Sequence, residues 1–259
     1  AEEALRELRR RLSGLEDDLR KAREERSKLE GERARAAAQL EVLEQAERSL
    51  SGLAEGARYI LQEARQGRLR GGYQALFSRL IVPAELETAL AAALGEFLDS
   101  VLLDSSASLD DALAALGRGE RGRAVVLPPR LFRPGEHIQA PEDEGCLGSA
   151  ADLVRGRDGA EELIAATRVL LGQTLIARDR AAALRLLPGL PPAARVVTLQ
   201  GEVFLAAGAV IAGKEQRGAA QAASLGRARR IQEQQAALRE HDARLDAARS
   251  AQKEIETRL

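Results

Sequence analysis

The sequence is poor in the residues that build cross-linked or reactive sites. It holds one cysteine, two histidines, four phenylalanines, two tyrosines, and no tryptophan or methionine. One cysteine excludes an intramolecular disulfide, and the scarcity of aromatic rings leaves little for stacking on bases. No secretory signal and no apolar run of membrane-spanning length occurs, which predicts a soluble cytoplasmic protein without a membrane partner. The absence of methionine even at position 1 suggests a piece of a longer chain.

An excess of charge of one sign is also lacking. The 39 basic and 40 acidic side chains leave a net charge of −1, although 31% of the residues are charged. Bulk charge therefore does not indicate a nucleic-acid partner, and any such binding must come from a local patch.

Two heptad-patterned segments flank the centre of the chain. In the first, over residues 1–50, positions three and four apart are mostly apolar and are separated by Glu, Arg, Lys and Gln, which is the pattern of a coiled-coil seam. The second, over residues 216–259, repeats this pattern. The seam positions are Leu5, Leu8, Leu12, Leu15, Leu19, Ala22, Leu29, Ala36, Leu40, Leu43 and Leu50, and then Ile231, Leu238, Leu245, Ala248, Ile255 and Leu259. A domain holding both ends would let the arms pair as one antiparallel coiled coil.

The centre reads as two similar α/β subdomains in tandem, over residues 51–140 and 141–215. In the first, we expect a strand at 101–103, a helix at 109–116 and a strand at 124–127. The same order recurs about 70–77 residues later as a strand at 174–179, a helix at 180–187 and a strand at 196–199. A helix beginning at Pro83 and ending near Gly95, and a hairpin turning at Gln200-Gly201, complete the α+β prediction.

The segment from Gly208 to Lys214 spells most of a phosphate-binding loop, G-x-x-x-x-G-K. The residue that should supply a magnesium-binding hydroxyl is Glu215, whose carboxylate would repel phosphate. The other reading of Gly208 and Gly213 is steric, since small residues along an exposed strand let a second backbone approach. From their small size alone, the two glycines could form a dimer seam or could simply make turns.

No catalytic or metal site is predicted. His137 and His241 are isolated from each other, and His241 falls on the heptad lattice, where it is expected to be a seam residue. Cys146 has no partner for metal binding or nucleophilic chemistry. Unbalanced basic residues, which could hold DNA phosphates or simply be surface charge, are Arg65, Arg68, Arg70, Lys214, Arg217, Arg227, Arg229 and Arg230.

Several ordered motifs resemble the hinge domain of bacterial SMC (structural maintenance of chromosomes) proteins. They are Leu80-Ile81-Val82-Pro83-Ala84-Glu85, Gly122-Arg123-Ala124-Val125-Val126-Leu127-Pro128, Cys146-Leu147-Gly148-Ser149-Ala150, and Val196-Val197-Thr198-Leu199-Gln200-Gly201-Glu202 followed by Gly208 and Gly213. They span the whole centre in the family's order, with coiled coil on both sides.

The resemblance implies a homodimer in which the first subdomain of one chain meets the second subdomain of the other. The family's two glycine pairs at that interface map onto Ala207-Gly208 and Ala212-Gly213, so this chain departs from the family by an alanine in each pair. Because alanine restricts φ, the seam is expected to be slightly less close. The resemblance also implies DNA contacts near the coiled-coil junction, carried onto Lys214 and Arg217. Arg68 and Arg70 are added to the candidate DNA-binding residues from the basic patch alone.

The family's ATP- and magnesium-dependent heads lie at the far ends of the arms, and none of their motifs is present. We therefore expect no enzyme activity and no cofactor in this segment. The resemblance implies a hinge that joins two arms of a nucleoid-associated ring, closed by a kleisin-type subunit, that entraps DNA for chromosome condensation and segregation. The alternatives are a nucleotide- or phosphate-binding domain displayed on a coiled coil, and an inert spacer.

Overall fold

The computed structural model describes residues 2–119, 122–133, 136–157, 161–213 and 222–259. The chain divides into two compact units. One joins Ala1–Ala46 with Arg230–Leu259, and the other is the globular unit Glu47–Arg229.

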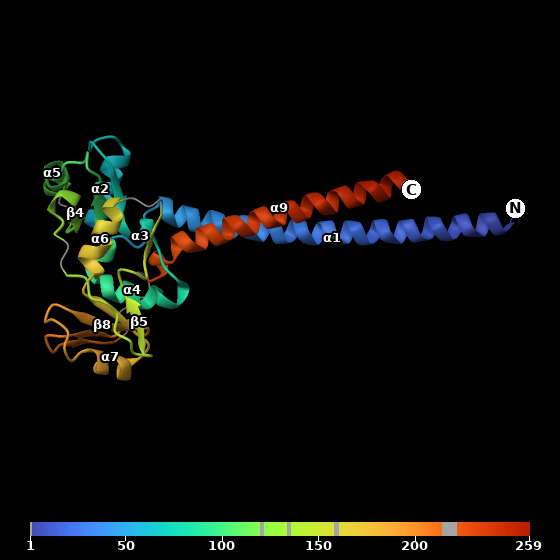
Figure 1. Ribbon diagram of the computed structural model, residues 1–259. Coiled ribbons are helices and arrows are strands. Elements are labelled where there is room, and N and C mark those ends of the chain that lie inside the picture. The colour runs from blue at the N-terminus through green and yellow to red at the C-terminus, as the bar shows by residue number, and fades with distance from the viewer. Residues whose placement is uncertain (1, 120–121, 134–135, 158–160, 214–221) are drawn as a thin grey trace. The chain divides into compact units, whose positions relative to one another are not determined.

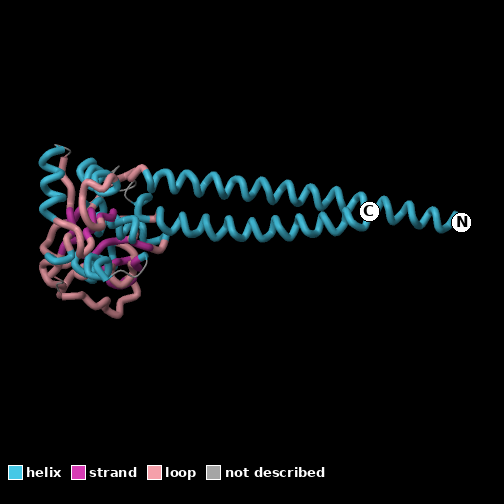
Figure 2. Tube along the Cα trace, turned by 90° about the horizontal axis from the view of Figure 1, so that it is seen from above, coloured by secondary structure: helices cyan, strands magenta, loops and turns pink. Residues whose placement is uncertain are grey.

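The first unit is an antiparallel pair of long helices, mainly α1 (Glu2–Arg48) and α9 (Arg227–Arg258). Figures 1 and 2 show the two unbroken helices side by side, with both chain ends at the same end of the pair. Ion pairs fix the direction, because the α9 partner moves back along the sequence as the α1 residue moves forward. The pairs are Arg23–Glu256 at 3.5 Å, Glu30–Arg249 at 3.9 Å and Arg33–Asp242 at 2.5 Å.

Apolar seam positions stabilise this pair. Leu29 and Ala36 of α1 and Ile231 and Leu245 of α9 are buried, as the heptads predict. The early seam leucines Leu5, Leu8 and Leu12 are exposed. They precede Arg23, whose ion pair with Glu256 joins α1 to the C-terminal part of α9. His241 was predicted to be a seam residue of the coiled coil. It faces the other helix, since its Nδ1 lies 3.8 Å from the Glu32 carboxylate of α1.

The globular unit begins with a three-stranded sheet and its helices. The elements are α2 (Glu55–Arg65), β1 (Tyr73–Ala75), α3 (Leu76–Arg79), β2 (Leu80–Ile81), α4 (Glu87–Leu94), β3 (Val101–Leu103), α5 (Leu109–Gly119) and β4 (Val126–Leu127), with 3-10 turns at Ala84–Leu86, Gly95–Asp99 and Pro129–Leu131. The strand order is β1-β3-β4, with β1 antiparallel and β4 parallel to β3.

A five-stranded sheet forms the second half. Its order is β10-β9-β8-β7-β5, and β7 and β8 are parallel while the other neighbours are antiparallel. The elements are β5 (Cys146–Ser149), β6 (Arg155–Gly156), α6 (Glu161–Leu171), β7 (Thr174–Ala177), α7 (Arg180–Leu186), β8 (Arg195–Thr198), β9 (Val203–Leu205) and β10 (Val210–Ile211). In Figure 1, α2 and α5 lie at one end of the globular unit and α7 and β8 at the other.

The two halves share one plan, which confirms the predicted tandem fold class. In each, an antiparallel strand flanks a parallel β-α-β unit, so that β1, β3, α5 and β4 correspond to β5, β7, α7 and β8. The second half adds the hairpin β8–β9, which turns at Gln200-Gly201 as predicted, and then β10. Strands β2 and β6, one from each half, pair with each other as a small antiparallel ladder.

One apolar core runs through both halves, with a smaller cluster under α7. The main core includes Ile60, Leu80, Leu98 and Leu171, all fully buried. Leu175, Val196 and Phe204 form much of the smaller cluster.

The helix expected to begin at Pro83 begins instead at Glu87. Pro83 precedes a 3-10 turn over Ala84–Leu86, a common form of helix entry, and the helix ends before Gly95 as expected. Gly95 adopts φ +54°, a conformation that favours glycine at this position.

Candidate dimer seam and basic surface

Strand β10 is an edge strand with an exposed apolar surface. Among the described residues it pairs with β9 alone, through Val210 opposite Phe204 and Ile211 opposite Val203. Val210 and Ile211 are 57% and 62% exposed, although they are apolar and β-branched. An edge strand of this kind offers unpaired backbone groups and apolar side chains to another strand.

Two glycines bound this edge. Gly208 has φ +104° and Gly213 φ +124°. Among the described residues, chain neighbours aside, no atom lies within 4 Å of the position a Cβ would take at either glycine. The Gly208 N–H donates to the Leu205 carbonyl at 2.9 Å and the Leu205 N–H to the Ala209 carbonyl at 2.8 Å, which closes the β9–β10 turn. Ala207 and Ala212, the other two predicted seam residues, are also exposed, so the four lie together on the edge hairpin.

The same geometry weakens the phosphate-loop reading. In that loop, the residues between the two glycines wrap around a phosphate with their N–H groups. Here Val210 and Ile211 are extended and paired with β9. Lys214 and Arg217 lie outside the described residues.

Strand β4 is a second sheet edge, a position that its sequence does not indicate. Among the described residues, Val126 and Leu127 pair with β3 alone, and Val126 is half-buried. At the opposite edge of the same sheet, β1 is packed against α2 and α3. The resemblance pointed to the first subdomain as a whole, and the strand could be found only once the sheet order was known.

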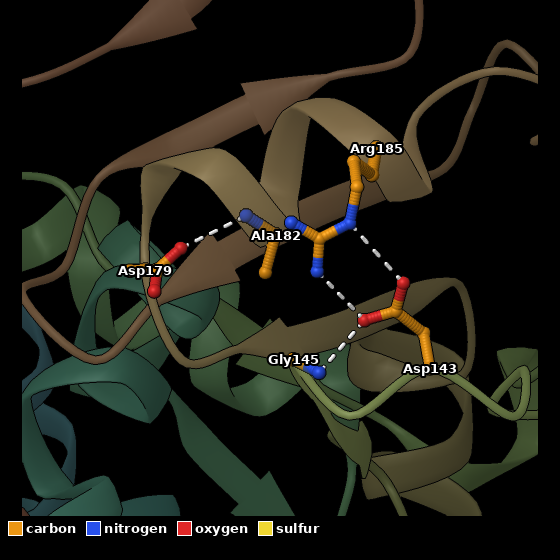
Figure 3. A network of polar contacts seen from close by, with 5 residues as sticks. All are labelled: Asp143, Gly145, Asp179, Ala182 and Arg185. Atoms are coloured by element: carbon orange, nitrogen blue, oxygen red, sulfur yellow. Dashed lines mark hydrogen bonds and ion pairs between the residues drawn. The ribbon is translucent and has the colours of Figure 1, made fainter.

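A network of polar contacts fixes α7 beside β5 at the other edge of the larger sheet (Figure 3). The Arg185 guanidinium donates to both carboxylate oxygens of Asp143, at 3.0 and 3.3 Å. Asp143 also accepts the Gly145 N–H at 2.7 Å. The hydrogen bond from Arg185, more than any other contact, holds the pKa of Asp143 below its usual range. Asp179 caps α7 by accepting the Ala182 N–H at 2.9 Å.

Arg195 on β8 is half-buried and has no carboxylate partner among the described residues. Its Nε donates to Thr174 Oγ1 at 2.9 Å and its Nη2 to the Leu170 carbonyl at 2.8 Å. Burial lowers the pKa of this guanidinium. Because Leu170 lies in the last turn of α6, the cation meets the negative end of the helix dipole.

The predicted basic residues differ in whether a group of the protein already binds their guanidinium. Arg68 donates to both carboxylate oxygens of Glu63, and this hydrogen bond lowers the pKa of Glu63. Arg227 donates to the Ser51 carbonyl at 3.1 Å and lies 5.6 Å from the centroid of the Phe77 ring.

One predicted cation, Arg70, and one that was not predicted, Arg118, have no such partner among the described residues. Arg70 is exposed and, like Arg118 on α5, has no hydrogen bond or ion pair within the described part of the chain. Arg118 had not been predicted, because its place beside Arg70 follows from the packing of α5 on α2.

His137 lies 3.0 Å from the Asp152 carboxylate. Within the described ranges, no group of three or more His, Cys, Asp or Glu side chains could hold a metal ion, and no helix is long and apolar enough to cross a bilayer.

The α+β globular unit and the antiparallel helices have the fold of solved SMC hinge domains. The structure titled an asymmetric dimer of the Geobacillus stearothermophilus SMC hinge domain matches with a TM-score of 0.81 at 24% identity, over 96% of this chain and 99% of that one. The Pyrococcus furiosus Smc hinge domain with an extended coiled coil matches with a TM-score of 0.51 at 21% identity, over 96% and 93% of the two chains.

Sequence comparison agrees with this fold. Residues 69–187 match the family described as "SMC proteins Flexible Hinge Domain". The chromosome partition protein Smc of Desulfitobacterium hafniense is 29% identical over 247 residues, and that of Gloeobacter violaceus 31% over 186 residues. These alignments cover 93% and 72% of this chain but 20% and 15% of the relatives. The chain carries an SMC hinge domain of the bacterial Smc type, and it spans at most about a fifth of those relatives.

Proposed function

We propose that this chain is a dimerisation hinge, and that the edge strand β10 forms its seam. The observation that carries the proposal is the exposure of Val210 and Ile211 on an otherwise well-packed sheet, between two glycines that leave the backbone uncovered. Burying apolar area of this kind against a second chain is favourable, and strand pairing would satisfy the edge backbone groups.

The complementary surface in the proposed dimer is strand β4 of a second copy. Pairing β10 of one chain with β4 of the other would join the five-stranded sheet to the three-stranded sheet across the interface. A two-fold axis then repeats the contact, so each dimer contains two such seams. The Geobacillus stearothermophilus hinge, which forms an asymmetric dimer, supports dimerisation of such a domain. The strands that meet and the two-fold arrangement are proposed from β10 and β4 alone.

In the whole protein, the proposed hinge joins two coiled-coil arms at one end of a ring that entraps DNA during chromosome partition, in the cytoplasm on the nucleoid. ATP hydrolysis, magnesium and a kleisin-type subunit belong to head domains beyond this segment. The hinge itself has no catalytic role in this proposal. Its DNA contacts are assigned to the basic residues Lys214, Arg217, Arg68 and Arg70, among which Arg68 already pairs with Glu63.

Placing charged side chains on the edge strand β10 tests whether it forms the dimer seam. We expect Val210→Lys combined with Ile211→Lys to raise the dimer dissociation constant by at least about tenfold, ~1.4 kcal/mol, because the two ammonium groups must be desolvated at the interface. Sedimentation velocity over a concentration series measures this. Both side chains are exposed in the single chain, so its fold should tolerate the change.

Leu184→Lys is the matched control, because Leu184 is an exposed apolar residue of α7 in the same subdomain. It should leave the dissociation constant unchanged. A double Lys variant that associates as tightly as the control would overturn the assignment of the seam to β10.

A further inference from the structure

We propose that Arg70 and Arg118 form a binding site for a phosphate oxyanion on the first subdomain. The two side chains line one surface depression of about 340 Å³, together with Arg68, Leu69 and Asp111. The site extends the DNA contact proposed above and is separate from the β10 hairpin on which dimerisation depends.

The backbone around Arg70 is fixed in place. Leu69 is buried, which anchors the loop between the two arginines that flank it. Gly71 has φ +92°, and a Cβ there would meet the Ala107 backbone at 2.4 Å, so the loop lies directly against the segment that leads into α5. A loop held in this way presents Arg70 at a constant position.

Arg118 approaches the depression from the other side. It lies in the last turn of α5, whose buried Ala112 and Ala115 belong to the core, and α5 packs on α2. Its field contributes to the lowered pKa of Glu63, after the larger effect of the hydrogen bond from Arg68.

Two of the three arginines that line the depression are available to bind an anion. Arg68 is paired with Glu63, whereas Arg70 and Arg118 have no internal partner within the described part of the chain. Among the described residues that line the depression, Asp111 is the one carboxylate, and it partly offsets the two cations. Two unpaired guanidinium groups at one depression suit a phosphate group, to which arginine can donate two parallel hydrogen bonds.

The lining also restricts what part of a ligand is recognised. The described residues that line the depression include no aromatic side chain on which a base could stack. The site therefore reads phosphate and not base identity. The phosphate could come from the backbone of a nucleic acid or from a free compound such as pyrophosphate, and the two sources are separable by experiment.

Fluorescence anisotropy with the full chain and a labelled DNA duplex of mixed sequence is the first test. We expect Arg70→Ala with Arg118→Ala to weaken binding by roughly tenfold or more at low salt, and to reduce the slope of log K against log salt by about two, if each cation neutralises one phosphate. Asp111→Asn should strengthen binding, because it removes the repelling carboxylate.

Arg168→Ala with Arg178→Ala is the matched control. It removes the same charge from two exposed arginines, and Arg168 occupies the last turn of α6, a helix of the same length as α5. It should preserve most of the affinity and the salt slope.

Calorimetry with pyrophosphate alone separates the two sources. Saturable binding that is lost in the Arg70/Arg118 variant assigns the site to free phosphate compounds. Duplex binding that depends on both arginines without pyrophosphate binding assigns it to the nucleic-acid backbone. If the variant behaves like the Arg168/Arg178 control with both probes, the site is wrong, while measured dimerisation and any remaining duplex binding would still support the hinge proposal.

Discussion

The ion pair between Arg185 and Asp143 joins two positions that are 42 residues apart in the sequence. It holds α7 against the loop that enters β5. Because the arginine is largely exposed, its effect on stability is expected to depend on solvent conditions. The pH dependence of folding is the most direct way to detect it.

The pKa of Asp143 is lowered in the folded chain, first by the hydrogen bond from Arg185. Its stabilising contribution is therefore complete above the unfolded pKa of aspartate, about 3.9, and is lost as the pH falls through the lower folded pKa. We predict that Arg185→Gln lowers the free energy of unfolding at neutral pH and that the difference from the parent chain shrinks in acid. Urea unfolding at a series of pH values measures it. A difference that stays constant down to strongly acidic pH would contradict this role, and Arg168→Gln should show no such dependence.

Some of the candidate residues could be identified from the sequence, and others could not. Gly208 and Gly213 could be singled out because small residues around a short strand have a steric meaning on their own. Whether Arg68 is a free cation could not be known, since it depends on the Glu63 rotamer at the end of α2. Arg118 was missed because it is one of many helical arginines until folding places it beside Arg70.

Among the elements, α1 is long enough to carry glycines that serve no visible packing purpose. Gly31 lies in the helix interior, is exposed, and has no atom within 4 Å of the position of an added Cβ. Glycine in a helix costs about 0.5–1 kcal/mol relative to alanine, mainly through backbone entropy.

We therefore predict that Gly31→Ala stabilises the helical pair by up to ~1 kcal/mol. Urea denaturation followed by circular dichroism at the helix band should show a higher midpoint. Gly56→Ala is the contrasting variant, because an added Cβ on α2 would meet the Arg123 carbonyl oxygen at 2.6 Å, and it should destabilise. A Gly31→Ala chain that unfolds at lower urea than the parent would show that Gly31 is needed for packing.

The long helices were the easiest elements to predict, because their heptads repeat the same information many times. The strand over Val101–Leu103 was predicted with its observed bounds, since a short apolar run between polar residues suits a buried strand. The strand expected at 124–127 is limited to Val126–Leu127, because strand length depends on how many residues find a partner in β3.

For the whole molecule, the sequence predicted two similar subdomains and the structure confirms them as repeated β-α-β units. The pairing of β2 with β6, and the position of β4 at a sheet edge, depend on contacts between residues far apart in sequence. Neither could be derived from local patterns. In the proposed seam, the small residues around β10 pointed to one edge from the sequence. The other edge, β4, could be identified only from the sheet order in the structure.

Dimerisation of this chain is the property on which the proposed hinge depends. Light scattering after size exclusion, over a dilution series of the 27.8 kDa chain, measures it. We expect a mass twice that value, maintained at low micromolar concentration. A mass of one chain at every concentration would contradict the dimerisation hinge.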